Sequence, residues 1–206
     1  MYRRDNHKAA RSAFTLIELL MVIGIIAVLI GILAPVLSAA RSRGKRTVCS
    51  NNLRQLMTGM SSYLNSSGDI YPYASYMPSV DPYPIEADDD NEAAGAIIFA
   101  DVLAPHMGED SKAFNCPADF GGIDRGPPHG PTPYYVTEKS SYEYRYRLGG
   151  RSLKQVLDRR AEFMGRRTSE SIYWIFRDID NFHGPAGKPG ARRYVYNDTH
   201  VADFEQ

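Results

Sequence analysis

One long apolar run near the N-terminus constrains this chain more than any other feature. From Leu19 to Leu37 there are nineteen consecutive residues that are apolar or small, apart from Pro35. A helix rises about 1.5 Å per residue, so this run approaches the ~30 Å thickness of a bilayer core. A helix on the surface of a soluble protein would show one polar face. We therefore predict a transmembrane helix.

A cleavable secretory signal is the alternative, because the small residues of "LAPVLSAA" (33–40) fit a signal cleavage site. Against it, the run is longer than a usual signal core, and Glu18 interrupts it early. Residues 1–11 carry four basic side chains and one acidic one, which favours a cytoplasmic N-terminus. The segment "RSRGKR" (41–46) is also basic, so charge alone does not decide the orientation.

Glu18 is the only charged residue between Arg11 and Arg41. A carboxylate at the bilayer centre costs about 2.5–3.5 kcal/mol, so it needs a partner or a role. A cut before Phe14 would create an amine four residues from Glu18, at the start of the helix. The helix dipole favours a carboxylate there, and the new amine supplies a cation for it. Such a cut would make Glu18 tolerable in the membrane.

The segment "AFTLIELLMVIGIIAVLIGILAP" (13–35) resembles the N-terminal segment of type IV prepilins and of type II secretion pseudopilins. The resemblance implies that a membrane aspartyl peptidase cuts between Ala13 and Phe14, and that Phe14 is then N-methylated. Glu18 becomes the fifth mature residue and Pro35 the twenty-second, as in that family. It further implies that Glu18 pairs with the terminal amine of an adjacent subunit. The family prefers Gly where this chain has Ala13, which predicts slow cleavage or a tolerant peptidase; a plain signal anchor is the alternative.

Four small residues follow one face of this helix at spacings of three, four and three: Gly24, Ala27, Gly31 and Ala34. Small side chains let membrane helices approach closely, which predicts a packing face. They are also common in membrane helices generally, and that alternative stays open. Pro35 removes a backbone donor and is expected to kink the helix or melt it locally.

The rest of the chain predicts a small head with mixed structure. Apolar residues from Cys49 to Leu64 recur at helical spacing, so we expect the helix to continue to about Asn65, before "SSGD" (66–69). A Pro- and Tyr-rich loop and a short helix over 92–108 come next. A half-exposed strand over 141–148, a buried strand over 171–176 and two short strands around a turn at 197–200 follow. This order predicts an α+β fold with an antiparallel sheet.

These elements give a pilin-like arrangement of four parts. We predict a basic leader (1–13), a transmembrane helix (14–37), its amphipathic continuation (38–66) and a globular extracytoplasmic head (67–206). The head motifs "CSNNLRQLMTGMSSYLNSSGDIYP", "FNCPAD" and "YNDTHVADF" also resemble a large pseudopilin-like family. That family has Gly where this chain has Thr199, so the last turn, which needs a positive φ, is expected to be altered.

Two groups of residues are candidates for cross-linking or metal binding. Cys49 and Cys116 are the only cysteines, and an even count outside the cytoplasm favours a disulfide; two buried thiols are the alternative. Two cysteines so far apart do not suggest a zinc site. Asp88, Asp89 and Asp90 offer oxygen ligands for calcium, which major pseudopilins hold in a head loop. Their spacing is not that of an EF-hand, and a solvated acidic loop is the alternative.

No sequence motif indicates catalysis. Asp180, His183, Asp198 and His200 could converge if the last strands pair, giving a metal or acid–base site, but nothing in their spacing demands it. The resemblance to the pseudopilin-like family instead implies a structural role, with polar side chains that satisfy turns. No nucleophile elbow or phosphate-binding loop is present, so we predict no enzyme. The 24 basic and 24 acidic side chains cancel, so nucleic acid is not an expected partner.

The sequence therefore predicts a pilin- or pseudopilin-like structural subunit of the inner membrane, single-pass, with its head periplasmic or extracellular. Its expected partners are prepilin peptidase, other subunits, the assembly platform and the lipid bilayer. A membrane-anchored enzyme or ligand-binding domain that uses the segment only for export is the alternative. Secretion, a surface pilus and DNA uptake are equally compatible with the sequence.

Overall fold

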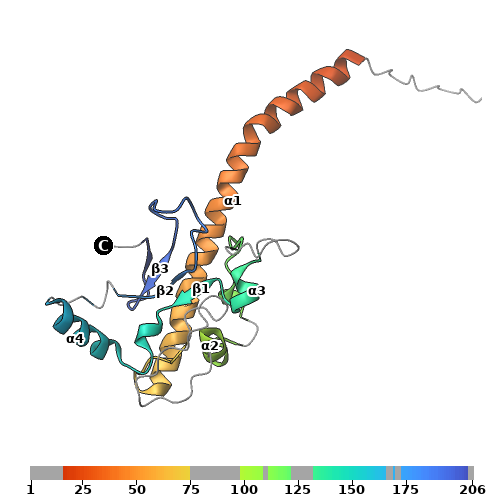
Figure 1. Cartoon of the computed structure of the whole chain (residues 1–206). Helices are drawn as coiled ribbons and strands as arrows, with labels where there is room; N and C mark the ends of the chain where they lie inside the picture. The colour runs from red at the N-terminus through yellow and green to blue at the C-terminus, as the bar shows by residue number, and fades with distance from the viewer. Residues whose placement is uncertain are drawn as a thin grey trace, which may run out of the picture. The chain divides into compact units, whose positions relative to one another are not determined.

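The computed structural model describes residues 16–74, 98–108, 111–121, 132–165, 169 and 173–203. The chain divides into two compact units, residues 1–41 and 42–206, and each is described by itself. One long N-terminal helix and a small four-stranded antiparallel sheet are its main elements (Figure 1). The predicted α+β class is confirmed. The finer boundaries of leader, membrane helix and head stay predictions.

Helix α1 runs from Leu16 to Ser67 and contains Pro35. The helix is unbroken at this proline, so of the two expected effects, a kink or local melting, melting is not seen. The helix ends at Ser67, two residues beyond the predicted end at about Asn65 and within the predicted stop at 66–69. Gly68 and Asp69 adopt positive φ values of 67° and 63°, which end the helix. The backbone N–H of Asp69 donates to the carbonyl of Leu64 at 3.0 Å, which closes the last turn.

In the first unit, the described part of α1 exposes all of its side chains. Among the described residues, α1 alone is long and apolar enough to cross a membrane, judged by length and composition. Exposed large apolar side chains run from Leu16 to Leu37. Nothing in the described chain covers this surface, so its stable environment is lipid or another protein.

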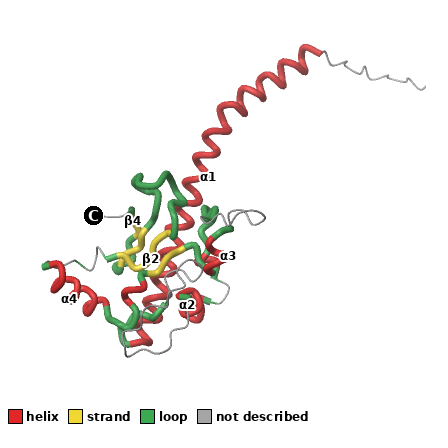
Figure 2. The backbone as a smooth tube through the Cα atoms, viewed as in Figure 1, coloured by secondary structure: helices red, strands yellow, loops and turns green. Residues whose placement is uncertain are grey.

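In the second unit, one face of the same helix contributes to the hydrophobic core of the head. Cys49, Leu53, Leu56 and Met60 are fully buried, at spacings of four, three and four. Helix α2 (Phe99–Met107) approaches so closely that a Cβ on Gly59 would collide with the side chain of Met107. Much of the rest of the described head is turn and loop, as Figure 2 shows.

The sheet has the order β1-β2-β3-β4, and every pair is antiparallel. Its strands are β1 (Tyr142–Tyr144), β2 (Trp174–Asp178), β3 (Tyr194–Tyr196) and β4 (Val201–Ala202). The last two strands flank the predicted turn at 197–200. Residues 171 and 172 of the predicted buried strand lie outside the described residues.

The strand predicted over 141–148 is shorter and more buried than its alternating pattern suggested. All three residues of β1 are buried, and the chain then turns into the 3-10 helix η2 (Tyr146–Leu148). Glu143 tolerates burial because the Arg177 guanidinium of β2 donates to both of its carboxylate oxygens, at 2.7 and 2.9 Å. The half-exposed pattern was therefore wrong, since the polar side chain is paired rather than solvated.

Three short helices and one of moderate length were not predicted from the sequence. They are η1 (Lys112–Phe114), α3 (Tyr134–Glu138), η2 and α4 (Leu153–Met164). Helix α4 begins with a capping box in which Ser152 and Gln155 exchange side-chain and backbone hydrogen bonds. A Ser with Gln three residues later is a recognisable start signal for a helix, so α4 was predictable.

In the turn between β3 and β4, Thr199 adopts the left-handed backbone conformation that glycine would adopt more easily. Thr199 has a φ of 71°, and its N–H donates to the Tyr196 carbonyl at 2.9 Å. The turn therefore keeps its positive φ, although Thr199 stands where the family has glycine. A β-branched residue pays a steric cost in this region that glycine does not.

We expect Thr199→Gly to raise the free energy of unfolding by about 0.5–1 kcal/mol, because relief of strain exceeds the added unfolded-state entropy of glycine. Urea unfolding of the full chain in detergent micelles measures the change. Thr199→Ala is the control, since it keeps a Cβ in the left-handed region and should show no such gain. Equal stability of the two variants would contradict the assignment of strain.

Candidate functional site

The described part of the predicted processing and assembly segment begins just after the proposed cut. Ala13 and Phe14 lie outside the described residues, as do the calcium candidates Asp88, Asp89 and Asp90. Glu18 lies in the first turn of α1, with an exposed side chain. A carboxylate at this end of a helix interacts favourably with the helix dipole.

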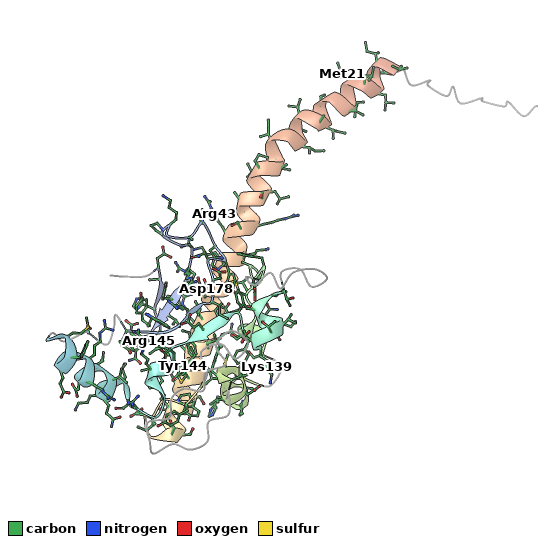
Figure 3. All side chains as sticks on the ribbon, in the orientation of Figure 1. Met21, Arg43, Lys139, Tyr144, Arg145 and Asp178 are labelled. Carbon is green, nitrogen blue, oxygen red and sulfur yellow. A yellow bond between two sulfur atoms is a disulfide. The ribbon has the colours of Figure 1, made fainter. Side chains whose placement is uncertain are left out.

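The small residues of α1 are exposed, and packing within the described chain does not require them. A Cβ added to Gly24 or Gly31 would meet no other atom within 4 Å, beyond the helix's own backbone. Gly59, in the head, is different because Met107 fills the space beside it. Figure 3 shows the side chains of this part of α1, Met21 among them, projecting outward from the helix. Ala27, Ala34 and Pro35 are exposed in the same way.

Cys49 and Cys116 are brought together in the head and form a disulfide, with their Cα atoms 5.1 Å apart. The bond joins α1 to the segment after η1 across 67 residues of sequence. Closing a loop of this length contributes about 4 kcal/mol in the chain-entropy model. Beside the bond, the Asn52 side chain donates to the carbonyl of Asn115 at 2.8 Å. Helix α1 is therefore attached to this segment by a covalent bond and a hydrogen bond.

His183 lies against this disulfide and against a buried carboxylate. Its side chain is 2% exposed, and its Nε2 lies 3.8 Å from Cys116 Sγ and 3.5 Å from Asp178 Oδ2. The two sulfur atoms and a ring nitrogen of His183 all lie within 4.8 Å of one another. Three segments that are distant in sequence therefore meet at one point: α1, the chain after η1, and the end of β2 with its following loop.

Asp180, His183, Asp198 and His200, for which the sequence left a shared site and a structural role open, do not form a common cluster among the described residues. Asp198 and His200 pair with each other in the β3–β4 turn, where both are partly exposed. Asp180 instead accepts hydrogen bonds from Asn181. The β2–β3 connection folds back over the disulfide, so His183 meets residues that strand pairing alone does not place beside it. No spacing in the sequence indicates this group, because its cysteines lie more than sixty residues before Asp178 and His183.

Asp178, which is labelled in Figure 3, ends β2. Its side chain is completely buried. Oδ2 accepts a hydrogen bond from the backbone N–H of Arg193 at 2.7 Å, whereas Oδ1 has no hydrogen-bond partner among the described residues. Burial raises the pKa of this carboxyl from 3.8 to about 7, against the opposing effects of Arg193, Arg192 and Arg46. Asp178 is thus partly protonated near neutrality.

The pKa of His183 is shifted in the opposite direction, downward. Burial and the nearby charges of Arg46 and Arg193 lower its pKa from 6.5 to about 4. Its ring is therefore neutral near pH 7 and keeps one nitrogen lone pair available. Both arginines are held by Asp203, whose Oδ1 lies 2.9 Å from Arg46 Nη2 and 2.8 Å from Arg193 Nη1.

A match to a protein family is found in the first unit, residues 1–41. Residues 8–34 match the prokaryotic N-terminal methylation motif. The matched segment contains Ala13, Phe14 and Glu18, and it confirms the resemblance to the type IV pilin and pseudopilin-like family in this segment. The methylation motif supports a prepilin-like protein that a peptidase processes. Comparisons with curated proteins and with solved structures found no match.

The opposite pKa shifts of Asp178 and His183 predict how stability depends on pH while the disulfide is intact. The stability that His183 contributes above pH 6.5 is lost as the pH falls toward 4. The Asp178 contribution has the other sign: it is fully present below pH 3.8 and is lost as the pH rises through 7. Over the same range the two effects oppose each other and largely cancel.

We therefore expect Asp178→Asn to lose stability relative to wild type on going from pH 7 to pH 4, and His183→Gln to gain it. Each relative change should be on the order of 3 kcal/mol, at about 1.4 kcal/mol per pKa unit. Urea unfolding at several pH values measures it, and comparison with wild type removes the effect of all other carboxylates. Profiles parallel to wild type in both variants would contradict the opposing shifts.

Proposed function

We propose that this protein is a pilin- or pseudopilin-like structural subunit that assembles through the first part of α1 into a filament or a secretion pseudopilus. The observation that carries the proposal is the methylation motif at 8–34, continued by an apolar helical surface that the described chain leaves uncovered. A helix of this kind is stable in a bilayer before assembly and among other helices afterwards.

Processing would take place between Ala13 and Phe14, on the cytoplasmic side of the inner membrane. The amine of Phe14, then N-methylated, would carry a positive charge close to the first turn of α1. Glu18 lies in that first turn and would pair with the amine of a neighbouring subunit. An ion pair between subunits would offset the cost of a carboxylate in an apolar environment.

The small-residue face would provide the close contact between helices. Gly24 and Gly31 have open space around them, so the chain itself gives no reason for glycine there. Together with Ala27 and Ala34 they form a surface on which a second helix can approach to short distance. The partners would be prepilin peptidase, other pilin-type subunits, the assembly platform and the lipid bilayer.

The head would act through its surface and without catalysis. The protein would cross the inner membrane once, with its N-terminus cytoplasmic and its head periplasmic or extracellular. Whether the assembly drives secretion, forms a surface pilus or takes up DNA depends on partners that the chain does not contain.

The first test is the mass and N-terminal residue of the protein isolated from native membranes. We expect the chain to begin at an N-methylated Phe14. Ala13→Gly should be cleaved faster than wild type, because the prepilin family prefers Gly at this position. An intact Met1, or a cut near Ala40, would contradict processing by the prepilin route.

We expect Glu18→Ala to be inserted and cleaved normally but to assemble poorly with wild-type subunits, since a charged terminal amine would lose its partner. Cysteine cross-linking between subunits in membranes should fall by at least roughly tenfold, which corresponds to about 1.4 kcal/mol. Glu162→Ala, which removes an exposed carboxylate from α4, is the matched control and should assemble normally.

Gly24→Leu should also weaken assembly, because its side chain would separate the helices without changing any charge. Normal assembly of both the Glu18 and the Gly24 variants would contradict the proposed contact.

A further inference from the structure

We propose that Cys49, Cys116, His183 and Asp178 form a zinc-binding site when the two cysteines are in the dithiol form. The site is independent of the methylation motif, because all four residues lie in the head unit. It would hold zinc before the disulfide forms, or after it is reduced, and would release the metal on oxidation.

The distances from His183 to Cys116 and to Asp178 fit tetrahedral zinc. Zinc binds sulfur at about 2.3 Å and imidazole nitrogen or carboxylate oxygen at about 2.0–2.2 Å, so neighbouring ligand atoms lie roughly 3.4–3.8 Å apart. Nε2 of His183 already lies 3.8 Å from Cys116 Sγ and 3.5 Å from Asp178 Oδ2. For four-fold coordination, the two sulfur atoms, which are bonded in the disulfide form, have to separate. The Asp178 carboxylate also has to approach them, because the group of ligand atoms within 4.8 Å of one another contains only the two sulfur atoms and the ring nitrogen.

The four side chains also have suitable chemistry. Thiolates, a neutral imidazole and a carboxylate are the ligand types that zinc prefers. His183 is buried and faces the sulfur atoms with a ring nitrogen. Asp178 is fully buried, and its Oδ1 has no hydrogen-bond partner among the described residues. The other oxygen of this carboxylate, Oδ2, lies 3.5 Å from His183 Nε2. A buried oxygen without a partner on a carboxylate beside a histidine is the unusual feature that a bound cation would explain.

Surrounding groups would hold these ligands in place. The Arg193 N–H binds Asp178 Oδ2, and the backbone N–H of Cys116 donates to the Ser141 hydroxyl at 3.0 Å. Zinc with two thiolates and one carboxylate carries a net charge of minus one. The guanidinium groups of Arg46 and Arg193, which act electrostatically on His183, would offset that charge. Outer contacts of this kind strengthen metal binding.

The redox step balances as a thiol–disulfide exchange. A dithiol reductant gives two electrons and two protons to the Cys49–Cys116 disulfide and becomes a disulfide itself. Zinc then displaces the two thiol protons, and a third proton where Asp178 is protonated. In the reverse direction, a disulfide oxidant takes two electrons from the thiolates, the sulfur–sulfur bond forms, and zinc leaves. Zinc would thus cross-link α1 to the head in the one state that lacks the covalent link.

The test uses the full chain in detergent micelles, reduced with dithiothreitol and freed of the reductant under argon. Titration with zinc against a chromophoric chelator should give one zinc per reduced chain and none for the disulfide form. Cobalt should give the thiolate charge-transfer band and the visible bands of tetrahedral coordination. Reoxidation should release the metal.

His183→Ala should weaken zinc binding by at least roughly tenfold, and Asp178→Asn should weaken it as well. His200→Ala is the matched control, because His200 also contacts an aspartate but lies away from the cysteines. Circular dichroism checks that each variant is folded.

The wild-type result alone decides the proposal if a variant fails to fold. A reduced chain that binds no stoichiometric zinc, or that gives cobalt spectra without thiolate bands, would overturn it. So would a folded His183→Ala chain with wild-type affinity, because the cysteines would then bind the metal without the site.

Discussion

The head depends on the buried stripe of α1 formed by Cys49, Leu53, Leu56 and Met60. The four strands of the head contain only two to five residues each. Strands this short are not stable without a hydrophobic layer against which to pack. The stripe provides that layer, and the disulfide prevents the helix from leaving it. The head is therefore organised around a helix that begins in the other unit, and not around its own sheet.

One continuous helix thus serves two environments, and only its side chains distinguish them. Up to Arg41 its described side chains are exposed and mostly apolar, which suits lipid or other helices. From Cys49 onward one face is buried in the head. Between these parts in the sequence, Arg46 of the helix forms an ion pair with Asp203 of the C-terminal region. An ion pair with both side chains partly exposed adds little stability, so it orients more than it stabilises.

Sequence patterns within a short stretch of the chain predicted the features that depend on neighbouring residues. The apolar run, the stop after Ser67 and the last two strands around their turn were all visible in the sequence. The burial of Glu143 was not, because it depends on Arg177, thirty-four residues later. The group around His183 was equally hidden, since tertiary folding alone brings its parts together. From the sequence, His183 was considered together with Asp180, Asp198 and His200, whereas in the structure it lies beside Asp178 and Cys116.

A disulfide by itself needs neither Asp178 nor His183. Burying a carboxyl group with one unsatisfied oxygen costs free energy, and an apolar pair of similar volume would fill this space at lower cost. Proteins tend to keep such costly polar groups where a function uses them. The cysteines account for the cross-link and not for the polar groups beside it. A metal ion that needs all four side chains, in the state where the sulfur atoms are not bonded, accounts for both.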